Sequence, residues 1–421
     1  MRQQLLHTPE GVRDIYNMEC EKKLSLQNNL HASLQLYGYH DIQTPTFEYF
    51  DVFRKEIGTI SSKELYKFFD RDGNTLVLRP DITPSIARAA ATLYEKADFP
   101  VRLCYMGNTF INHSSYQGLL KENTQLGAEL IGDDSIEADA EMLALVVDSL
   151  KKVGLEDFQV SVGHVDFFQS LMDEANLEED VEEQIRELII NRNYFGVEEL
   201  LDQTLITPHM KEIFHMLPEL VGGKEVLQKA MKYAPNIKAT EAISRLISIY
   251  DILKSYGAAD YVSFDLSTSG TYGYYTGIIF RGYTFGTGDA VVKGGRYDHL
   301  IEKFGQQSPS IGFAIVIDEL MSALTRQKIN ITYEKENTLI VYEPETRDWA
   351  ISLARDFREK GKNTELVKQE EQKSLADYIT YGKRNLSGNM LYLKKQEEIV
   401  MINLHTDEEK IVPWNNTVNT K

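Results

Sequence analysis

The clearest pattern of hydrophobic and polar positions lies at residues 101–132, where two extended stretches flank a polar loop. Apolar residues alternate with other residues at its start, a turn-rich cluster occupies 112–118, and an extended apolar pattern resumes at 125–131. Period-two alternation is typical of β-strands, so we predict a strand, a loop and a second strand. Gln125 and Glu129 are four residues apart and therefore lie on one face of the second strand.

This polar pair has two interpretations. A buried carboxylate beside a buried amide costs several kcal/mol unless both groups find partners, and such a pair would mark a built site. The alternative is a strand whose outer face is simply exposed to water. On this stretch alone the two interpretations carry equal weight.

The first part of the chain mixes helical and strand patterns. Apolar residues at helical spacing predict a long amphipathic helix over residues 18–36, which ends at Gly38 and is followed by a strand containing Pro45. The other elements predicted before residue 166 are a hairpin (66–70 and 75–78, turning at 72–74), helices at 85–96 and 135–153, and a strand at 158–163.

The pattern changes at residue 167. Up to residue 257 one helical pattern follows another without strand-like alternation, which predicts a helical insertion in a sheet-based domain. The predicted helices cover residues 168–175, 181–192, 197–202, 209–216, 223–233 and 238–256. Strand patterns return at 261–266 and 274–280, and residues 309–320 are typical of a strand that runs into a helix.

A polar, strongly charged stretch from residue 330 to about residue 337 predicts a linker to a last domain. Beyond it we predict strands at 338–342, 365–367, 390–393 and 399–404, and helices at 347–360 and 372–381. This alternating order indicates a small α/β domain with a mainly parallel sheet. The predicted segments are therefore a core in two parts (1–166 and 258–329), a helical insertion (167–257) and a C-terminal α/β domain (330–421).

Charge and cysteine content narrow the function classes. The net charge is −19, which argues against a broad nucleic-acid-binding face, because such faces depend on clustered Lys and Arg. The two cysteines, Cys20 and Cys104, are far apart and have no zinc-site spacing. We find no pattern of a signal peptide and no apolar run long enough to span a bilayer. These features predict a cytoplasmic protein without a membrane contact.

Several motifs carry a resemblance to a known family. The run Gln-Leu-Gly-Ala-Glu at 125–129 ends a strand, loop and strand that resemble motif 2 of the class II aminoacyl-tRNA synthetases, in the version found in histidyl-tRNA synthetase. The helix at 18–36 with the strand after it resembles motif 1, which builds the dimer interface in that family. Residues 309–320 resemble motif 3.

Further motifs resemble the amino-acid site of histidyl-tRNA synthetase. The run Leu-Arg-Pro-Asp-Ile-Thr at 78–83 matches a family run whose acidic residue and threonine hold the α-amino group of histidine, so the resemblance assigns that role to Asp81 and Thr83. The alternative for Asp81 and Thr83 is a helix N-cap. Tyr274 and Tyr275 match a tyrosine pair of the family. The run Gly-Gly-Arg-Tyr-Asp at 294–298 matches as well, and its glycines let the backbone approach a small ligand, whereas a tight turn with a surface ion pair is the alternative. The predicted histidine-binding residues are Asp81, Thr83, Gln125, Glu129, Tyr274 and Tyr275.

The resemblance fails at the positions that handle ATP. Where the family has its phosphate-binding and catalytic arginines, this chain has Ile111, Gly270 and Glu319. An aliphatic side chain cannot make a charge-assisted contact with phosphate, and a carboxylate facing a triphosphate is repulsive. The adenylation chemistry is therefore predicted to be absent, and we assign no catalytic residue.

A synthetase frame without this chemistry resembles the regulatory subunits of ATP phosphoribosyltransferase. The resemblance implies an α+β fold, with a class II aminoacyl-tRNA synthetase-like antiparallel sheet core, a helical insertion and a C-terminal α/β domain in the place of the anticodon-binding domain. It also implies a homodimer that assembles with the short catalytic subunit of ATP phosphoribosyltransferase in the first step of histidine biosynthesis. The glycosyl transfer between ATP and phosphoribosyl pyrophosphate then takes place on the partner. Histidine is the expected effector, and no cofactor, metal or tRNA is expected.

Two other classes of protein stay open. An active histidyl-tRNA synthetase would need the phosphate-binding arginines and a basic face for tRNA. A stand-alone histidine-binding protein would share the pocket but would have no enzyme partner, and an acidic surface does not separate it from a regulatory subunit. Whether the effector site lies in this chain, at an interface or on the partner is left open by the sequence.

Overall fold

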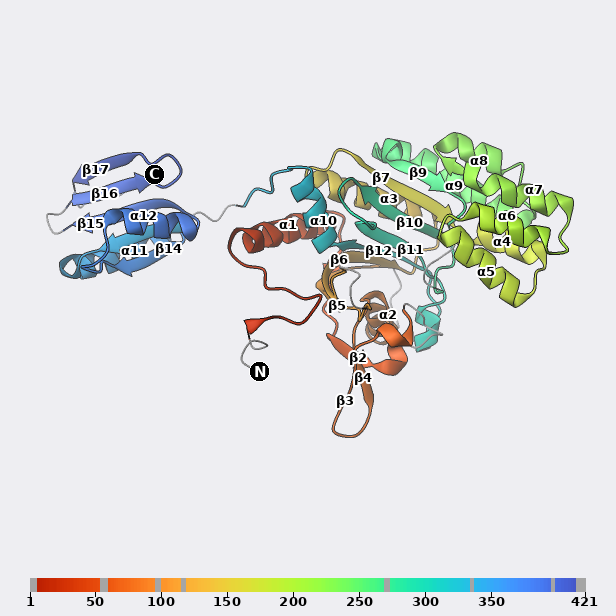
Figure 1. The fold of residues 1–421 in the computed structure, drawn as a ribbon, viewed down its shortest axis with the longest axis horizontal. Coiled ribbons are helices and arrows are strands. Elements are labelled where there is room, and N and C mark those ends of the chain that lie inside the picture. Colours follow the sequence, from red (N-terminus) through yellow and green to blue (C-terminus); the bar gives the residue numbers. More distant parts are fainter. Residues whose placement is uncertain are drawn as a thin grey trace. The chain divides into compact units, whose positions relative to one another are not determined.

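The computed structural model describes residues 6–53, 60–94, 100–114, 119–268, 273–333, 337–394 and 398–413. The chain divides into two compact units, one formed by Met1–Asp14 and Leu26–Ile331, the other by Ile15–Ser25 and Thr332–Lys421. Figure 1 shows the elements of both units. Within the described residues no helix combines the length and the hydropathy that a membrane span requires.

A nine-stranded sheet forms the centre of the larger unit, with the strand order β1-β5-β6-β12-β11-β10-β7-β9-β8. Neighbouring strands are antiparallel except for β1 with β5 and β7 with β9, which are parallel. The antiparallel core is thus confirmed, within a sheet that is mixed as a whole. The strands are β1 (His40–Asp41), β5 (Val101–Phe110), β6 (Glu122–Ile131), β7 (Phe158–His164), β8 (Val221–Gly222), β9 (Val262–Asp265), β10 (Ile278–Thr284), β11 (Val292–Arg296) and β12 (Ser310–Val316).

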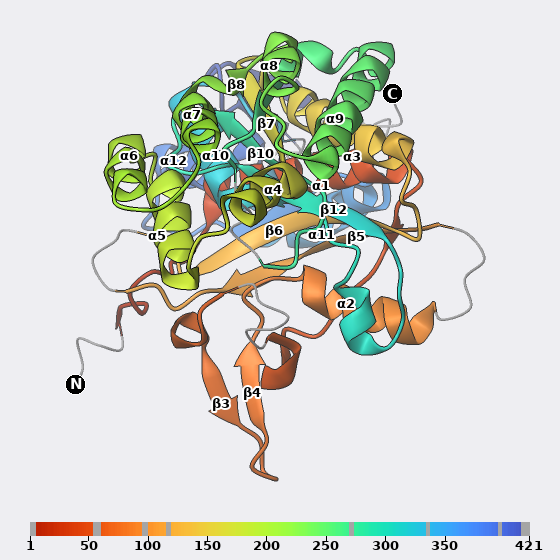
Figure 2. The ribbon, with the colours of Figure 1, turned by 90° about the vertical axis from the view of Figure 1, so that its right-hand side faces the viewer.

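Helices cover one face of this sheet and bury the main hydrophobic core against it (Figure 2). Helix α3 (Ile136–Lys152) shows why this sequence is helical: the Ser135 hydroxyl accepts a hydrogen bond from the Ala138 amide, and the helix begins with acidic and ends with basic residues. Leu26, Leu30 and Leu34 of α1 (Asn17–Leu36) belong to the same core. Helix α10 (Ile317–Arg326) follows β12 directly, as the sequence pattern predicts.

Helices form at all six places predicted between residues 167 and 257. They are α4 (Val165–Ala175), α5 (Glu179–Ile190), α6 (Tyr194–Asp202), α7 (Pro208–Met216), α8 (Lys224–Ala230) and α9 (Ile237–Tyr256). The prediction that this stretch contains no strand is wrong, because β8 lies between α7 and α8 and pairs with β9. Two residues are too few to show alternation. The helices share the hydrophobic core of the sheet, and their status as a separate inserted domain stays a prediction.

The other face of the sheet carries α2 (Thr83–Leu93) and a small sheet with the order β2-β4-β3 (Figure 2). Strands β3 (Lys67–Phe69) and β4 (Thr75–Leu78) form the predicted hairpin, and β2 (Phe47–Tyr49) completes that sheet. Pro45 lies between β1 and β2 rather than in a strand. The strand predicted at 274–280 begins only at Ile278, so the two tyrosines lie in the irregular segment before β10.

The smaller unit contains a five-stranded sheet with the order β14-β13-β15-β16-β17. Two strand pairs are parallel and two are antiparallel, so the prediction of a mainly parallel sheet is wrong. The difference arises from β17, which the sequence pattern did not indicate, and from the hairpin between β15 and β16. The elements are β13 (Asn337–Tyr342), α11 (Arg347–Glu359), β14 (Thr364–Lys368), α12 (Leu375–Arg384), β15 (Ser387–Lys394), β16 (Glu398–Asn403) and β17 (Glu409–Pro413).

Candidate functional site

Successive side chains of strand β6 lie on opposite faces of the main sheet. Leu126, Ala128 and Leu130 pack into the core under the helices, whereas Gln125 and Glu129 lie on the opposite face, together as predicted. Glu129 is completely buried, so the interpretation of this face as exposed to water is wrong at that position. A carboxyl group buried at this position needs hydrogen-bond partners.

Space for the Glu129 side chain comes from a glycine on the neighbouring strand. Gly312 of β12 lies directly opposite Glu129 in the register of the sheet. A Cβ atom at Gly312 would stand 1.5 Å from Oε2 of Glu129, which is far inside van der Waals contact. Gly127 similarly leaves room for the ring of Tyr105. These glycines let large polar and aromatic side chains lie flat on the sheet.

Two hydroxyl groups hold the Glu129 carboxylate. The Thr83 hydroxyl donates to Oε1 over 2.8 Å, and the Tyr297 hydroxyl donates to Oε2 over 2.5 Å. Burial raises the pKa of Glu129 to about 8, against the two hydroxyls that favour the charged form, and the nearby charge of Asp81 raises it further. The side chain is therefore mostly protonated at neutral pH.

Asp81 lies just before α2, whose N-cap is Ile82 and has no side-chain cap, so the alternative of a helix N-cap formed by Asp81 or Thr83 is wrong. The Oδ1 atom of Asp81 accepts hydrogen bonds from the Ile82 amide (2.7 Å) and the Thr83 amide (3.4 Å), which lead into the helix. Its Oδ2 accepts a longer bond of 3.3 Å from the Tyr274 hydroxyl. Burial raises the pKa of Asp81, which shows how strongly the surroundings desolvate this carboxylate. One oxygen supports the helix, and the other is directed toward Tyr274.

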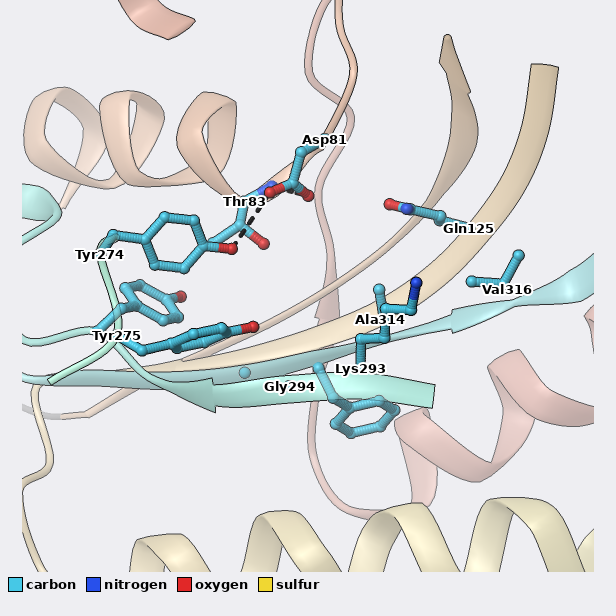
Figure 3. A pocket seen from close by; sticks show the side chains of 12 residues that line it. Asp81, Thr83, Gln125, Tyr274, Tyr275, Lys293, Gly294, Ala314 and Val316 are labelled. Carbon is cyan, nitrogen blue, oxygen red and sulfur yellow. Dashed lines mark hydrogen bonds between the residues drawn. The ribbon is translucent and has the colours of Figure 1, made fainter. Parts of the chain in front are cut away.

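These groups surround a pocket of about 410 Å³, a volume that includes open solvent (Figure 3). Five of the six predicted residues line it, and Glu129 lies behind the wall, in contact with Thr83 and Tyr297. The lining consists of Asp81, Thr83, Gln125, Tyr274, Tyr275, Lys293, Gly294, Tyr297, Gly312, Phe313, Ala314 and Val316. The structure thus brings together residues from five separate segments of the chain.

Three tyrosines form an aromatic wall of this cavity. The ring centroids of Tyr274 and Tyr275 are 4.8 Å apart, and those of Tyr274 and Tyr297 are 6.0 Å apart in an edge-on arrangement. The ring of Tyr275 lies against Gly295, where a Cβ atom would come within 2.7 Å of it. A planar, partly polar ligand group fits such a wall, because rings offer both apolar faces and hydroxyl groups.

The Gly-Gly-Arg-Tyr-Asp run lies in and just after β11 rather than in a tight turn. Its arginine, Arg296, is buried and bonds Asp139 over 2.6 Å and Asp298 over 3.2 Å, so its ion pairs are internal to the protein. Tyr297 of this run was not among the predicted site residues, nor were Lys293 and Gly312. The motif itself was the signal for Tyr297, whereas nothing in the local pattern indicates Lys293 or Gly312.

The positions that replace arginines lie apart from these contacts. Ile111 follows the end of β5 and is half-buried. Glu319 lies in the first turn of α10, where burial and the charge of Asp289 raise its pKa. Gly270 lies outside the described residues. The structure therefore places no cation at the two positions that it describes.

One group of side chains in the described part of the chain has the spacing of metal ligands. His31, Asp41 and Cys104 bring their ligand atoms within 4.8 Å of one another. Asp41 accepts hydrogen bonds from His31 (2.5 Å) and from the Cys104 thiol (3.5 Å). Burial raises the pKa of Cys104 to about 12, so the thiol keeps its proton and the group is hydrogen-bonded as it stands.

The chain is similar to known proteins over most of its length. A family model described as histidyl-tRNA synthetase matches residues 11–320. An ATP phosphoribosyltransferase regulatory subunit from Acetivibrio thermocellus is 41% identical over 356 residues, which cover 85% of each chain. Another protein of that description, from Ruminiclostridium cellulolyticum, is 35% identical over 401 residues and 95% of each chain.

Solved structures show the same likeness. A Bacillus halodurans structure described as an ATP phosphoribosyltransferase regulatory subunit/histidyl-tRNA synthetase superposes with a TM-score of 0.82 at 32% identity, covering 92% of this chain and 98% of that one. Apo histidyl-tRNA synthetase from S. aureus superposes with a TM-score of 0.67 at 22% identity over 97% of each chain, which shows the fold alone. The predicted class II synthetase-like fold is confirmed.

Proposed function

This chain belongs to the family of ATP phosphoribosyltransferase regulatory subunits, and we propose that it activates a short catalytic subunit of that enzyme by assembling with it. In this proposal the transfer between ATP and phosphoribosyl pyrophosphate takes place on the partner. The chain itself contributes a synthetase-like frame with an amino-acid pocket. A homodimer as the building block and a cytoplasmic location belong to the same proposal.

The observation that carries a non-catalytic role is the environment of Glu319. Its carboxylate is half-buried; burial and the charges of Asp289 and Asp318 raise its pKa, while the charges of Lys293 and Arg326 lower it. A carboxylate at this position repels a triphosphate, whereas a synthetase needs a cation there to offset the charge that develops during adenylation. Ile111 supports the same conclusion, because it offers no charge to phosphate.

Titration of a short catalytic subunit with this chain tests the assembly. The rate of the catalytic subunit should rise and saturate at a fixed ratio, and size exclusion with mass measurement should show one complex at that ratio. A rate that does not change, with two separate peaks on the column, would contradict the proposal. That outcome together with histidine binding would favour a stand-alone histidine-binding protein.

Pyrophosphate exchange tests whether the chain lacks adenylation chemistry. Exchange with histidine and ATP should equal a control without protein, because both described arginine positions lack a cation. Exchange well above that control would favour an active synthetase. The net charge of −19 leads us to expect no tRNA binding either, which a filter-binding titration at low salt can check.

We further propose that the cavity binds histidine as the effector. Asp81 offers a buried carboxylate oxygen to the α-ammonium group, and the tyrosine wall offers ring faces to the imidazole. Calorimetric titration of histidine into the chain alone, then into the complex with the catalytic subunit, tests this. Binding that occurs only in the complex would place the effector site at the interface or on the partner.

A further inference from the structure

A single lysine stands between the amino-acid cavity and its neighbour. Lys293 of β11 lines both the first cavity and a second one of about 640 Å³, which share Tyr275 and Gly294 as well. In the sheet it lies opposite Ala314 on one side and Arg281 on the other. Figure 3 shows its amino group directed away from the strand toward the open part of the first cavity.

Lys293 is the one cationic side chain among the described residues that line the first cavity. The arginine positions of the synthetase motifs have no cation, since they are Ile111, Gly270 and Glu319. Any carboxylate that enters this cavity has Lys293 as its available counter-charge.

Polar groups of opposite charge lie on different sides of the first cavity. The Asp81 carboxylate lies at the α2 side, while the Lys293 ammonium rises from β11 on the floor of the sheet (Figure 3). Between them lies Gln125, whose buried Oε1 finds no hydrogen-bond partner within the described residues. A carboxylate, an amide and an ammonium around one cavity match an α-amino acid in its zwitterionic form, with a donor group left for the free amide oxygen.

We propose that Lys293 binds the α-carboxylate of the amino acid in this cavity, in place of the missing arginines. This inference rests on the proposed binding of histidine. The present partner of Lys293 is Asp289, at 2.5 Å from its Nζ, and both side chains are partly exposed, at 34% and 57%. Exposed ion pairs contribute little, so a ligand carboxylate in the cavity can share or take over the ammonium group.

The consequence is a preference for amino acids over amines. Histamine has the imidazole ring and the ammonium group of histidine but lacks the carboxylate. A charge-assisted hydrogen bond lost in a desolvated pocket costs roughly tenfold to a hundredfold in affinity. We therefore expect the wild-type chain to bind histidine about tenfold to a hundredfold more tightly than histamine.

The contact between Lys293 and the ligand carboxylate can be isolated by comparing two ligands on two proteins. Histidine and histamine are titrated calorimetrically into the wild-type chain and into Lys293→Met. The variant should bind the two ligands within about threefold of each other, because the carboxylate has lost its partner. Freeing Asp289 from its ion pair attracts the ammonium group that both ligands carry, and this attraction cancels in the affinity ratio.

Two matched variants complete the test. Lys293→Arg keeps the charge and should keep the preference for histidine, whereas Lys232→Met removes an exposed lysine elsewhere and should leave both affinities unchanged. Melting curves check that each variant is folded. If Lys293→Met is unfolded, the test is the ratio of histidine to histamine affinity in wild type and in Lys293→Arg. A wild-type chain that binds neither ligand would refute the proposed histidine site itself. Clear histidine binding, with the same ratio in wild type and Lys293→Met or with no preference in wild type, would overturn the role of Lys293 alone.

Discussion

The two neighbouring cavities on the main sheet differ in how their polar groups are satisfied. In the first, Asp81 and Glu129 are buried and bonded to hydroxyl and amide groups around them. In the second, Arg281, Asp289 and Lys293 line an open space, and the carboxylate of Glu319 interacts with the charge of Asp289. The buried carboxylates of the first cavity are held by specific hydrogen bonds, whereas the ion pair of Lys293 and Asp289 at the second cavity is partly exposed.

This difference explains how a protein of this fold can bind an amino acid without carrying out chemistry on ATP. Buried carboxylates persist only where the surrounding structure satisfies them, so the first cavity needs its whole set of partners. Exposed charges near the second cavity are weakly coupled, so an arginine can be replaced there without disturbing the sheet. A frame of this kind can lose nucleotide chemistry and still keep an amino-acid site.

Adding one methyl group at Gly312 should produce the largest effect on the first cavity. In Gly312→Ala the new Cβ would lie 1.5 Å from Oε2 of Glu129, which Thr83 and Tyr297 hold in place. We expect a loss of at least about 1–3 kcal/mol of unfolding free energy and histidine binding below detection. Gly288→Ala is the matched control, because nothing lies within 4 Å of its Cβ position. Equal stability of the two variants would mean that Glu129 is free to move.

The raised pKa of Glu129 predicts how stability depends on pH. The ordinary value is 4.5 and the folded value about 8, so folding favours the protonated form. The stabilising contribution is therefore complete below pH 4.5 and is lost as the pH rises to about 8. A tenfold change in the acid dissociation constant corresponds to about 1.4 kcal/mol, so wild type should lose several kcal/mol relative to Glu129→Gln across this range.

Denaturant unfolding of wild type and Glu129→Gln at pH 5 and pH 8.5 measures that difference. Glu319→Gln provides the comparison, because the carboxylate of Glu319 is only half-buried and its replacement should change the slope less. Parallel pH curves for wild type and Glu129→Gln would show that Glu129 is ionised in the folded protein.

Removing the charge of Asp81 should weaken histidine binding far more than removing the charge of Glu319. In Asp81→Asn the remaining carbonyl oxygen can still accept from the Ile82 and Thr83 amides, so the start of α2 is kept. The loss of one charge-assisted bond should cost roughly 1.5–3 kcal/mol, or about tenfold to a hundredfold in affinity. Glu319→Gln should leave the calorimetric affinity within about twofold. If the two variants behave alike, the first cavity is not the histidine site.

The smallest effect is expected at Tyr274. In Tyr274→Phe the ring can keep its packing on Tyr275, while the 3.3 Å bond to Asp81 is lost. A neutral donor of this kind is worth about 0.5–1.5 kcal/mol, so histidine affinity should fall by about twofold to tenfold. Tyr283→Phe, an exposed tyrosine of β10, should have no effect. A hundredfold loss in Tyr274→Phe would show that the hydroxyl contacts the ligand directly.

Local patterns in the sequence determined most helices and strands. The six helices between residues 165 and 256, the hairpin of β3 and β4, and the shared face of Gln125 and Glu129 all follow from periodicity, which depends on neighbours in the chain. Where an element was too short or ended a meander, as in β8 and β17, the periodic signal was absent. The amino-acid motif at 78–83 likewise indicated Asp81 and Thr83, and both line the cavity.

How these residues act together depends on the tertiary structure. The Thr83 hydroxyl reaches a carboxylate 46 positions away and the Tyr297 hydroxyl reaches the same group over 168 positions, because the sheet places their strands and helix side by side. Strand pairing sets Gly312 opposite Glu129 and Lys293 at the edge of the cavity. Burial and charge at a point in space depend on every element packed there, and periodicity along one element contains no information on that environment.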